Sequence, residues 1–377
     1  MSKTLQDYAT LINDTIQSNE INHYITTDNM CQNLGGIDTF KNINIPQGKV
    51  RSFQKDDVLL SNIRLYFRKV YRAKQKGGCS SDVLVFRAKH IDSATLFAIL
   101  SSQIFTDYAC SGSQGSKMPR GNKTHMMNFK IPTINFTITK IFNSIQNKIE
   151  NNHKINELLH KILELLYEQY FVRFDFLDEN NKPYQTSGGK MKFSKELNRL
   201  IPSGWSVRFL NHKIVSTYQP KTISKTLLND SYSYSVYGGG GIIGRFTEYN
   251  HEQSEFIISC RGQCGISYLT LPKSWITGNA MVIRPTKSYT SKTYLYHTIN
   301  KYKLTNYITG SVQPQITRQN LSTMPILIPK RKTLNKWNNI SSLLWNLIHN
   351  NMQSTQTLTA LRDFLLPLLL KQQVKPQ

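Results

Sequence analysis

Two regions of the chain consist of short apolar runs separated by polar turns. The runs at 58–61 and 83–87 in the first region, and at 256–259 and 280–283 in the second, are rich in Val, Ile and Leu, and Gly, Asn and Ser cluster between them. Runs of this length bounded by turn residues are typical of buried strands. Each region is therefore predicted to be a mixed α/β domain with a twisted sheet, and a helix is expected at 91–108 of the first and at 293–307 of the second.

Two long stretches instead carry apolar residues at heptad spacing. At ~1.5 Å per residue, a helix of about 33 residues is roughly 50 Å long, so a partner must lie along its apolar stripe. The other helix is the obvious partner, which predicts an antiparallel coiled coil. The predicted seam consists of Ile138, Ile141, Ile145, Ile155, Leu159, Ile162 and Leu166 in the first helix and Trp337, Ile340, Leu344, Leu358, Leu361, Leu365 and Leu368 in the second.

Asn152 and Asn351 interrupt the two seams at equivalent positions. A buried Asn commonly fixes the register of a coiled coil, and a solvated interruption of the seam is the alternative interpretation. In an antiparallel pair these two residues are expected to lie close together, with one domain at each end.

The two apolar regions also resemble each other in sequence. Arg87 in VLVFR corresponds to Arg284 in AMVIRP, and Pro132 corresponds to Pro329, in both cases at a distance of 197 positions. The Gly-rich turns NLGGI and YGGGGII correspond only with a gap, and the two helices correspond at an offset of 199. Matches at a nearly constant offset indicate a duplicated domain.

The predicted fold class is therefore α+β, with two α/β domains in tandem that are separated and joined by two long helices. The predicted parts are residues 1–135, the first domain; 136–190, the first helix and a linker; 191–332, the second domain; and 333–377, the second helix.

The net charge of the chain indicates the class of its binding partner. The chain has 47 Lys and Arg against 23 Asp and Glu, a net charge of +24. Most of the excess falls in the two domains, +7 in residues 1–135 and +15 in residues 190–332. A basic surface on folded, aromatic-rich segments favours a polyanion, and nucleic acid above a membrane surface or an acidic protein.

The sequence shows no motif that would supply catalytic residues. The five cysteines form neither a disulfide framework nor a zinc motif, and the nine histidines are dispersed. No phosphate-binding loop is present, and the carboxylates of the second domain are too few for a magnesium cluster. The longest apolar stretch, 364–370, is too short to span a bilayer. We therefore expect a cytoplasmic chain with no catalytic residue, metal or cofactor of its own.

The turns, in contrast, carry side chains that are suitable for binding DNA. Arg pairs with guanine and Asn or Gln with adenine in the major groove, whereas Lys and Tyr grip phosphate. For any single residue, a solvent-exposed or strand-capping role is the alternative. The candidates are Asn62, Arg64, Tyr66, Arg68, Lys69, Gln114, Lys117 and Arg120 in the first domain, and Arg261, Gln263, Ser267, Gln313, Gln315 and Arg318 in the second.

The order of these parts over essentially the whole chain resembles the specificity subunit of type I restriction-modification enzymes. The segments that carry the resemblance are YITTDNM (24–30), SNIRLYFRKVYRAKQKGGCSSDVLVFR (61–87), GSKMP (115–119), IPSGW (201–205), YGGGGIIGR (237–245), ISCRGQCG (258–265), NAMVIRP (279–285) and GSVQPQITRQNLSTMPILIP (310–329). The first domain departs from the pattern because it lacks an IPSGW block. Within these segments, Thr27, Asn29, Tyr237 and Arg245 are further DNA-binding candidates.

The resemblance implies two target recognition domains, each reading half of a split, asymmetric site, with the helix pair setting the gap. It also implies methyltransferase subunits, two in number, which bring S-adenosylmethionine, and restriction subunits that use ATP and magnesium. These partners would dock on the outward faces of the helices, including Phe142, Ile149, Leu158 and Leu343. Packing of these four side chains against the domains is the alternative.

Two rival functions remain open at this point. A stand-alone DNA methyltransferase or endonuclease would need an N-P-P-Y or D-P-P-Y motif with a cofactor loop, or a metal-carboxylate site. A structural nucleic-acid-binding protein would show weak sequence preference and no stable enzyme partner.

Overall fold

The computed structural model describes residues 3–38, 43–131, 136–229, 232–262, 264–310 and 313–369. The chain divides into two compact units. The first consists of Met1–Lys154 and Met352–Gln377, and the second of Ile155–Asn351. Each unit contains part of both long helices, and we call the rest of each unit its head. The four-part division by residue number stays a prediction.

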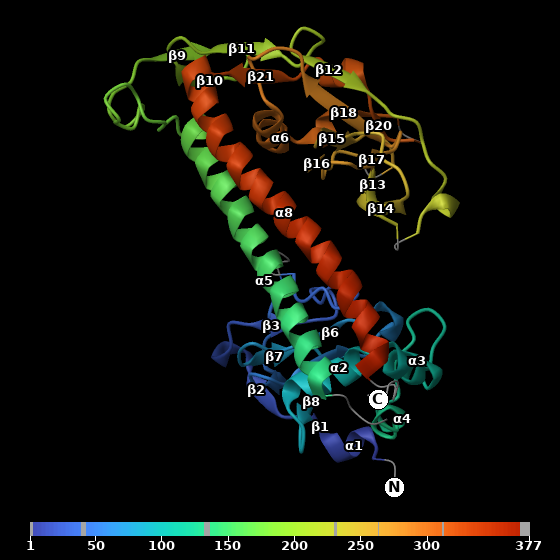
Figure 1. The fold of residues 1–377 in the computed structure, drawn as a ribbon. Helices are drawn as coiled ribbons and strands as arrows, with labels where there is room; N and C mark the ends of the chain where they lie inside the picture. Colours follow the sequence, from blue (N-terminus) through green and yellow to red (C-terminus); the bar gives the residue numbers. More distant parts are fainter. Residues whose placement is uncertain are drawn as a thin grey trace. The chain divides into compact units, whose positions relative to one another are not determined.

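The first head is built on two four-stranded sheets (Figure 1). One is antiparallel throughout, with the order β1 (Ala9–Ile12), β8 (Val83–Ala88), β5 (Val58–Ser61) and β6 (Val70–Arg72). The other has the order β2 (Thr15–Gln17), β4 (Lys49–Phe53), β7 (Gly77–Cys79) and β3 (Tyr24–Ile25), with β3 parallel to β7.

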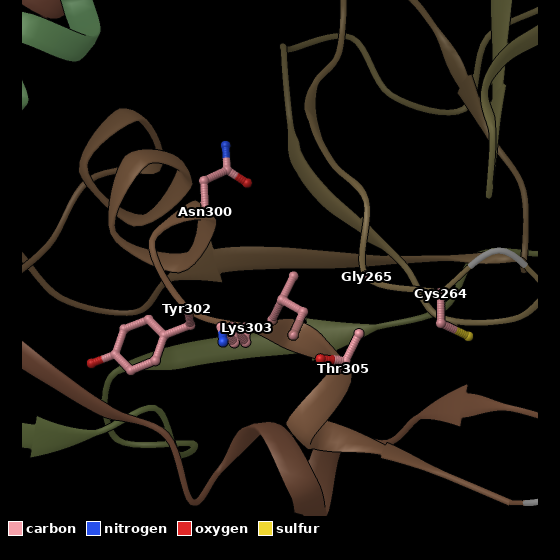
Figure 2. A pocket seen from close by; sticks show the side chains of 7 residues that line it. Cys264, Gly265, Asn300, Tyr302, Lys303 and Thr305 are labelled. Carbon is pink, nitrogen blue, oxygen red and sulfur yellow. The ribbon is translucent and has the colours of Figure 1, made fainter.

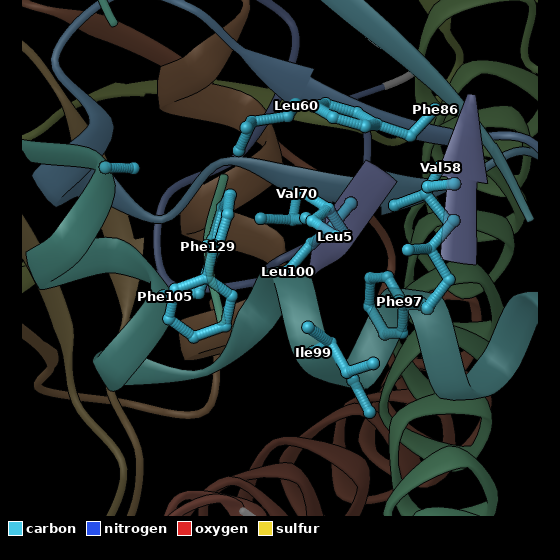
Figure 3. Packing of buried hydrophobic residues seen from close by; sticks show 14 of the residues in the cluster. Leu5, Val58, Leu60, Val70, Phe86, Phe97, Ile99, Leu100, Phe105 and Phe129 are labelled. Carbon is cyan, nitrogen blue, oxygen red and sulfur yellow. The ribbon is translucent and has the colours of Figure 1, made fainter. Parts of the chain in front are cut away.

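Short helices cover the first of these sheets. They are α1 (Leu5–Tyr8), α2 (Ser93–Ser101), α3 (Gln103–Ser111) and α4 (Lys123–Met127), with 3-10 turns η1 (Ser18–Glu20) and η2 (Leu65–Phe67). The single helix expected at 91–108 is wrong, because the Ser102 side chain accepts a hydrogen bond from the Phe105 N–H and starts a new helix. Phe97 and Phe105 from the two helices pack with Phe129 in one apolar core (Figure 3).

The second head repeats this plan. Its main sheet has the order β12 (Val215–Tyr218), β18 (Ala280–Pro285), β15 (Phe256–Ser259) and β16 (Ser267–Leu269), with the same antiparallel pairing as in the first head. A second sheet joins β14 (Gly241–Phe246), β13 (Tyr234–Gly238) and β17 (Trp275–Ile276), and β13 runs parallel to β17 as β3 does to β7. The duplication predicted from Arg87 and Arg284 is thus a duplication of sheets; Pro132 lies outside the described residues.

Small elements complete the second unit. Three two-stranded sheets pair β9 (Met191–Ser194) with β10 (Arg199–Pro202), β11 (Ser206–Phe209) with β21 (Pro325–Ile328), and β19 (Ile308–Thr309) with β20 (Gln315–Ile316). The remaining elements are η4 (Lys225–Leu227), α6 (Lys292–Asn300), η5 (Leu304–Tyr307) and α7 (Arg318–Leu321).

The long helices are α5 (Phe136–Tyr167), which continues into the π-turn η3 (Glu168–Val172), and α8 (Arg331–Leu369). In the first unit, buried Asn152 donates to the Thr355 hydroxyl at 3.1 Å. In the second, Asn351 donates to the Asn156 side chain at 2.9 Å. Partner numbers fall on α8 as they rise on α5, so the helices pair antiparallel within each unit, as predicted.

The predicted seam between the helices is partly wrong. Ile141, Ile155, Ile162, Ile340 and Leu361 are exposed, whereas Ile145 and Trp337 are buried as expected and the other predicted residues are half-buried. The interface instead contains polar and aromatic side chains, which a count of apolar heptad positions does not detect. The buried positions on the two helices are Thr139, Phe142, Ile145, Gln146, Ile149, Asn152, Leu163 and Tyr167, and Thr333, Leu334, Trp337, Ser341, Trp345, Ile348, His349, Arg362 and Leu366.

The four residues expected on outward faces divide evenly. Phe142 and Ile149 are buried, and Phe142 belongs to the core of the first head, so their outward placement is wrong. Leu158 and Leu343 are exposed, as expected.

Candidate nucleic-acid interface

A turn after the central strand β5 carries most candidates of the first head. Residues 62–69 leave the sheet at Ser61 and return at Lys69, whose carbonyl accepts from the Ser61 N–H at 3.0 Å. Arg64 and Arg68 have φ of 49° and flank η2. Left-handed non-glycine residues carry backbone strain that neighbouring structure must hold in place, and such residues cluster at functional sites.

Two other segments hold this turn. The loop 114–121 reaches it through hydrogen bonds from Arg64 N–H to Pro119 O at 2.9 Å and from Gly121 N–H to Asn62 O at 3.1 Å. The loop 26–38 also contacts the turn 62–69, because Lys69 Nζ donates a hydrogen bond to Thr27 O at 2.6 Å. The candidate loops of the first domain, far apart in sequence, therefore form one surface.

Some candidate side chains of this surface face solvent. Tyr66 is 53% exposed, Lys117 is exposed, and Arg120 is exposed although it makes an ion pair with Asp82 at 2.9 Å. The Arg64 guanidinium is half-buried, lies over Phe67 and donates to Lys117 O at 3.4 Å. These side chains can reach a ligand laid across the loops.

Other candidates of the first head turn inward. Arg68 donates to Ser101 O at 2.9 Å, and burial lowers the pKa of its guanidinium. Asn29 is buried, accepts from Thr26 N–H at 2.8 Å and donates to Tyr24 O at 3.1 Å. Asn62 has its Oδ1 enclosed without a hydrogen-bond partner among the described residues. In this structure the side chains of Arg68 and Asn29 stabilise the conformation of the loops.

The second head brings together the corresponding segments. The turn 260–266 follows β15, and Ile316 N–H donates to Cys260 O at 3.0 Å while Arg261 and Gln315 form a β-bridge. The tetraglycine turn closes the third side. A Cβ atom on Gly239 would lie 3.0 Å from Arg261 O, so only glycine fits there without displacing the turn.

The exposed candidates of the second head are Arg261, Gln313, Gln315 and Arg318. Neither arginine makes an ion pair within the part of the chain that the structure describes. Both guanidiniums are therefore available for the bidentate hydrogen bonds that guanine or phosphate accepts.

Three candidates of this head are less accessible, and one is not described. Tyr237 is buried, its hydroxyl accepts from Leu271 N–H at 3.0 Å, and burial raises its pKa to about 12. Arg245 donates to Ser233 O at 2.6 Å, and the Ser267 hydroxyl is enclosed without a hydrogen-bond partner among the described residues. Gln263 lies outside the described residues.

A pocket of about 220 Å³ adjoins the turn 260–266 (Figure 2). Cys264 and Gly265 line it from the turn, and Asn300, Lys303 and Thr305 line it from the segment around the end of α6. Sequence reasoning missed these last three residues because it read 293–307 as a single helix. The polar run NKYKLTN, at the site of the break, is the signal that could have found them.

The described residues contain no group of three or more His, Cys, Asp or Glu that could hold a metal ion. The five cysteines, all described, form no disulfide with one another. Each surface therefore offers hydrogen-bond donors, amides and positive charge around a set of interlocked loops, which suits recognition of a polyanion.

Comparisons with known proteins agree with this geometry. A family model for the type I restriction modification DNA specificity domain matches residues 202–361. The fold is similar to that of the type I restriction-modification system S subunit from M. genitalium, with a TM-score of 0.62, 14% identity, and coverage of 99% of this chain and 96% of that chain. The family match is confined to residues 202–361, whereas the likeness of fold extends over nearly the whole chain.

Two further solved structures align over nearly the whole chain. The HsdS subunit from Thermoanaerobacter tengcongensis has a TM-score of 0.35 and 15% identity, and covers 98% of this chain and 95% of its own. A chain from a study of complex assembly and conformational transition of the type I R-M system has a TM-score of 0.36 and 14% identity, with coverage of 98% and 97%. No curated protein sequence matches this one. None of the described helices is long and apolar enough to cross a membrane.

Proposed function

We propose that this chain reads a two-part, asymmetric DNA sequence, one part with each head, and directs partner methyltransferase and restriction subunits to it. The observation that carries the proposal is the convergence of three loop segments in each head. The segments occupy corresponding places after the central strands β5 and β15, but they present different side chains, with Tyr66, Lys117 and Arg120 in one head and Arg261, Gln315 and Arg318 in the other. Different donors and acceptors on one scaffold suit two unlike half-sites.

Within each head we divide the contacts by chemistry. Arg261 and Gln315 lie side by side in a β-bridge, which places a guanine reader next to an adenine reader. Arg64 has the corresponding role in the first head. Lys117, Lys303 and Arg318 serve as phosphate contacts, which orient the protein but carry little sequence information.

The methyltransferase subunits, two by analogy with the family, dock on exposed apolar stripes of the long helices. In the second unit, Ile155, Leu158, Ile162 and Leu165 follow one another on a single face of α5, and Ile340, Leu343 and Leu347 do so on α8; all seven are exposed. Apolar residues repeating every three or four positions form a continuous stripe on a helix. A stripe of this kind is suited to burial against a partner protein.

The cofactors in this scheme belong to the partners. S-adenosylmethionine binds to the methyltransferase subunits, and ATP and magnesium to the restriction subunits, all in the cytoplasm. This chain contributes recognition of the DNA sequence and the docking surface for the partners.

The test is to co-express the chain with the type I methyltransferase subunit of the same genome and to map genomic methylation by single-molecule sequencing. We expect methylation at one split motif, and only when both proteins are present. Methylation by this chain alone would make it an enzyme. Methylation without any sequence preference would leave it a general DNA-binding partner, and either result contradicts the proposal.

A further inference from the structure

A buried arginine near the end of the chain contacts the first head. Arg362 lies on α8, and its side chain is only 1% exposed. One terminal nitrogen donates to Gln146 Oε1 on α5 at 3.1 Å, and the other donates to Asn33 O at 3.1 Å. Gln146 is also buried and donates to Leu34 O at 3.0 Å. The helix pair thus holds two successive carbonyls of the loop 26–38.

The same two loop residues hold the recognition turn from their other side. Asn33 N–H donates to Phe67 O at 2.9 Å, and Leu34 N–H donates to Arg68 O at 3.1 Å. Hydrogen bonds therefore connect Arg362 and Gln146, through the residues Asn33 and Leu34, to the turn that carries Arg64 and Tyr66. Every bond of this path lies within the first unit.

Backbone strain along the path shows why the anchor matters. Asn33 and Leu34 have φ of 52° and 60°, so both are left-handed, as are Arg64 and Arg68 in the turn. Non-glycine residues hold such conformations when surrounding contacts over-determine them. Here the carbonyls of Asn33 and Leu34 are fixed by the helices and their N–H groups by the turn.

The second head lacks this polar anchor. The helices correspond at an offset of 199, so Arg362 corresponds to Leu163, and Gln146 corresponds to Trp345. Leu163 has no donor, and Trp345 Nε1 is buried without a hydrogen-bond partner among the described residues. The polar pair is thus peculiar to the first head, although both helix positions are buried in both units.

We propose that Arg362, together with Gln146, is a positioning residue for the recognition turn of the first head, so that discrimination at one half-site depends on a side chain near the far end of the chain. This inference rests on the proposed function. Arg362 contacts no DNA in this scheme. It fixes the loop that fixes Arg64 and Tyr66.

The test uses the full chain in complex with its methyltransferase subunit. Methylation rates are compared on duplexes that carry the target or single base-pair changes in either half, with the half read by the second head identified by Arg261→Ala. The variants are Arg362→Leu, which introduces the residue of the second helix, and Gln146→Leu. Arg362→Lys keeps the positive charge but cannot make the two guanidinium hydrogen bonds to Gln146 and Asn33 at once. It replaces Arg362→Leu in the comparison if the leucine variant does not fold. Asp363→Asn is the control, because Asp363 contacts Arg362 but not the loop.

We expect Arg362→Leu and Gln146→Leu to lower discrimination at the first half-site by about tenfold, consistent with loss of a charged hydrogen bond, and to leave the second half-site unchanged. Asp363→Asn should change neither ratio. Equal loss at both half-sites, or a lower melting temperature with first-half discrimination intact, would make the pair merely structural. A wild-type complex without sequence preference would instead refute the proposed function, so the two failures are distinguishable.

Discussion

Arg87 donates two hydrogen bonds of 2.8 Å, one to each carboxylate oxygen of Asp57. The second head repeats this contact, since Arg284 on β18 donates to Glu255 at 2.8 Å. Each carboxylate precedes the central strand of its sheet and is almost fully buried. The duplicated arginines therefore anchor the strands that lead into the recognition turns.

Arg87→Leu should lower the free energy of unfolding by about 2 kcal/mol, because it leaves the Asp57 carboxylate buried without its cation. The value is below that of a fully buried pair because Arg87 is partly exposed. Scanning calorimetry of the full chain measures the change. Lys301→Ala removes ion pairs with Glu164 and Glu168 in which all three side chains are solvent-accessible, and should cost under ~1 kcal/mol. An equal loss for both variants would show that burial of Asp57 carries no weight.

Arg261→Ala should relax discrimination at one half-site by about 1–3 kcal/mol while the other half is still read. Binding to duplexes with single base changes, at fixed salt concentration, measures this. Arg208→Ala is a matched control, because Arg208 is also exposed but lies on β11, outside the three converging segments. Uniform weakening on all duplexes would mark Arg261 as a phosphate contact.

Leu343→Glu should weaken association with the methyltransferase subunit by about tenfold or more, since burial of a leucine contributes roughly 1.5–3 kcal/mol. Leu343 is 61% exposed, so the melting temperature should not change. The control is Ser342→Glu, which adds the same charge at an exposed position about 100° away around the helix. Affinity can be followed by titration calorimetry. Equal weakening by both variants would indicate a charge effect without a docking stripe.

Acid should destabilise the second unit through buried histidines. Burial lowers the pKa of His297 to about 3 and that of His349 to about 4, from 6.5. Between these values and 6.5 the unfolded chain binds more protons, so stability is complete above pH 6.5 and falls as the pH drops. At pH 5 each histidine costs about 2 kcal/mol. His297→Phe keeps the ring contacts with Tyr167 and Trp337, and should show a shallower fall in melting temperature between pH 7.5 and pH 5. An unchanged slope would show that His297 does not titrate on unfolding.

The strands and the duplication could be predicted because both depend on local patterns. The runs around Leu60 and Ile258 each contain three consecutive apolar residues, and the pair Arg87 and Arg284 has the same spacing as the pair Pro132 and Pro329. The convergence of loops could not be predicted, since it depends on which turns a sheet brings together. Tyr237 shows the difficulty, because the register shift between Val236 and Tyr237 helps to decide what that strand buries, and no sequence pattern marks it.

The prediction of the seam between the helices failed for a different reason. Heptad analysis assigns the most apolar stripe to the interface between helices. Here the polar side chains of Gln146 and Arg362 are buried, whereas Ile155 and Ile340 of the predicted seam are exposed. Heptad analysis cannot detect this exchange, because it assumes that polar side chains face solvent.

Leu366 belongs to the same apolar core as Leu5 and Phe142. The core of the first head is therefore incomplete until α8 has been synthesised. At 5–20 residues per second, the roughly 220 residues from Phe142 to Arg362 take on the order of 10–45 s to translate. During that time the nascent first head has neither Leu366 in its core nor Arg362 on its loop. We therefore expect the first head to reach its final structure only after α8 has joined it.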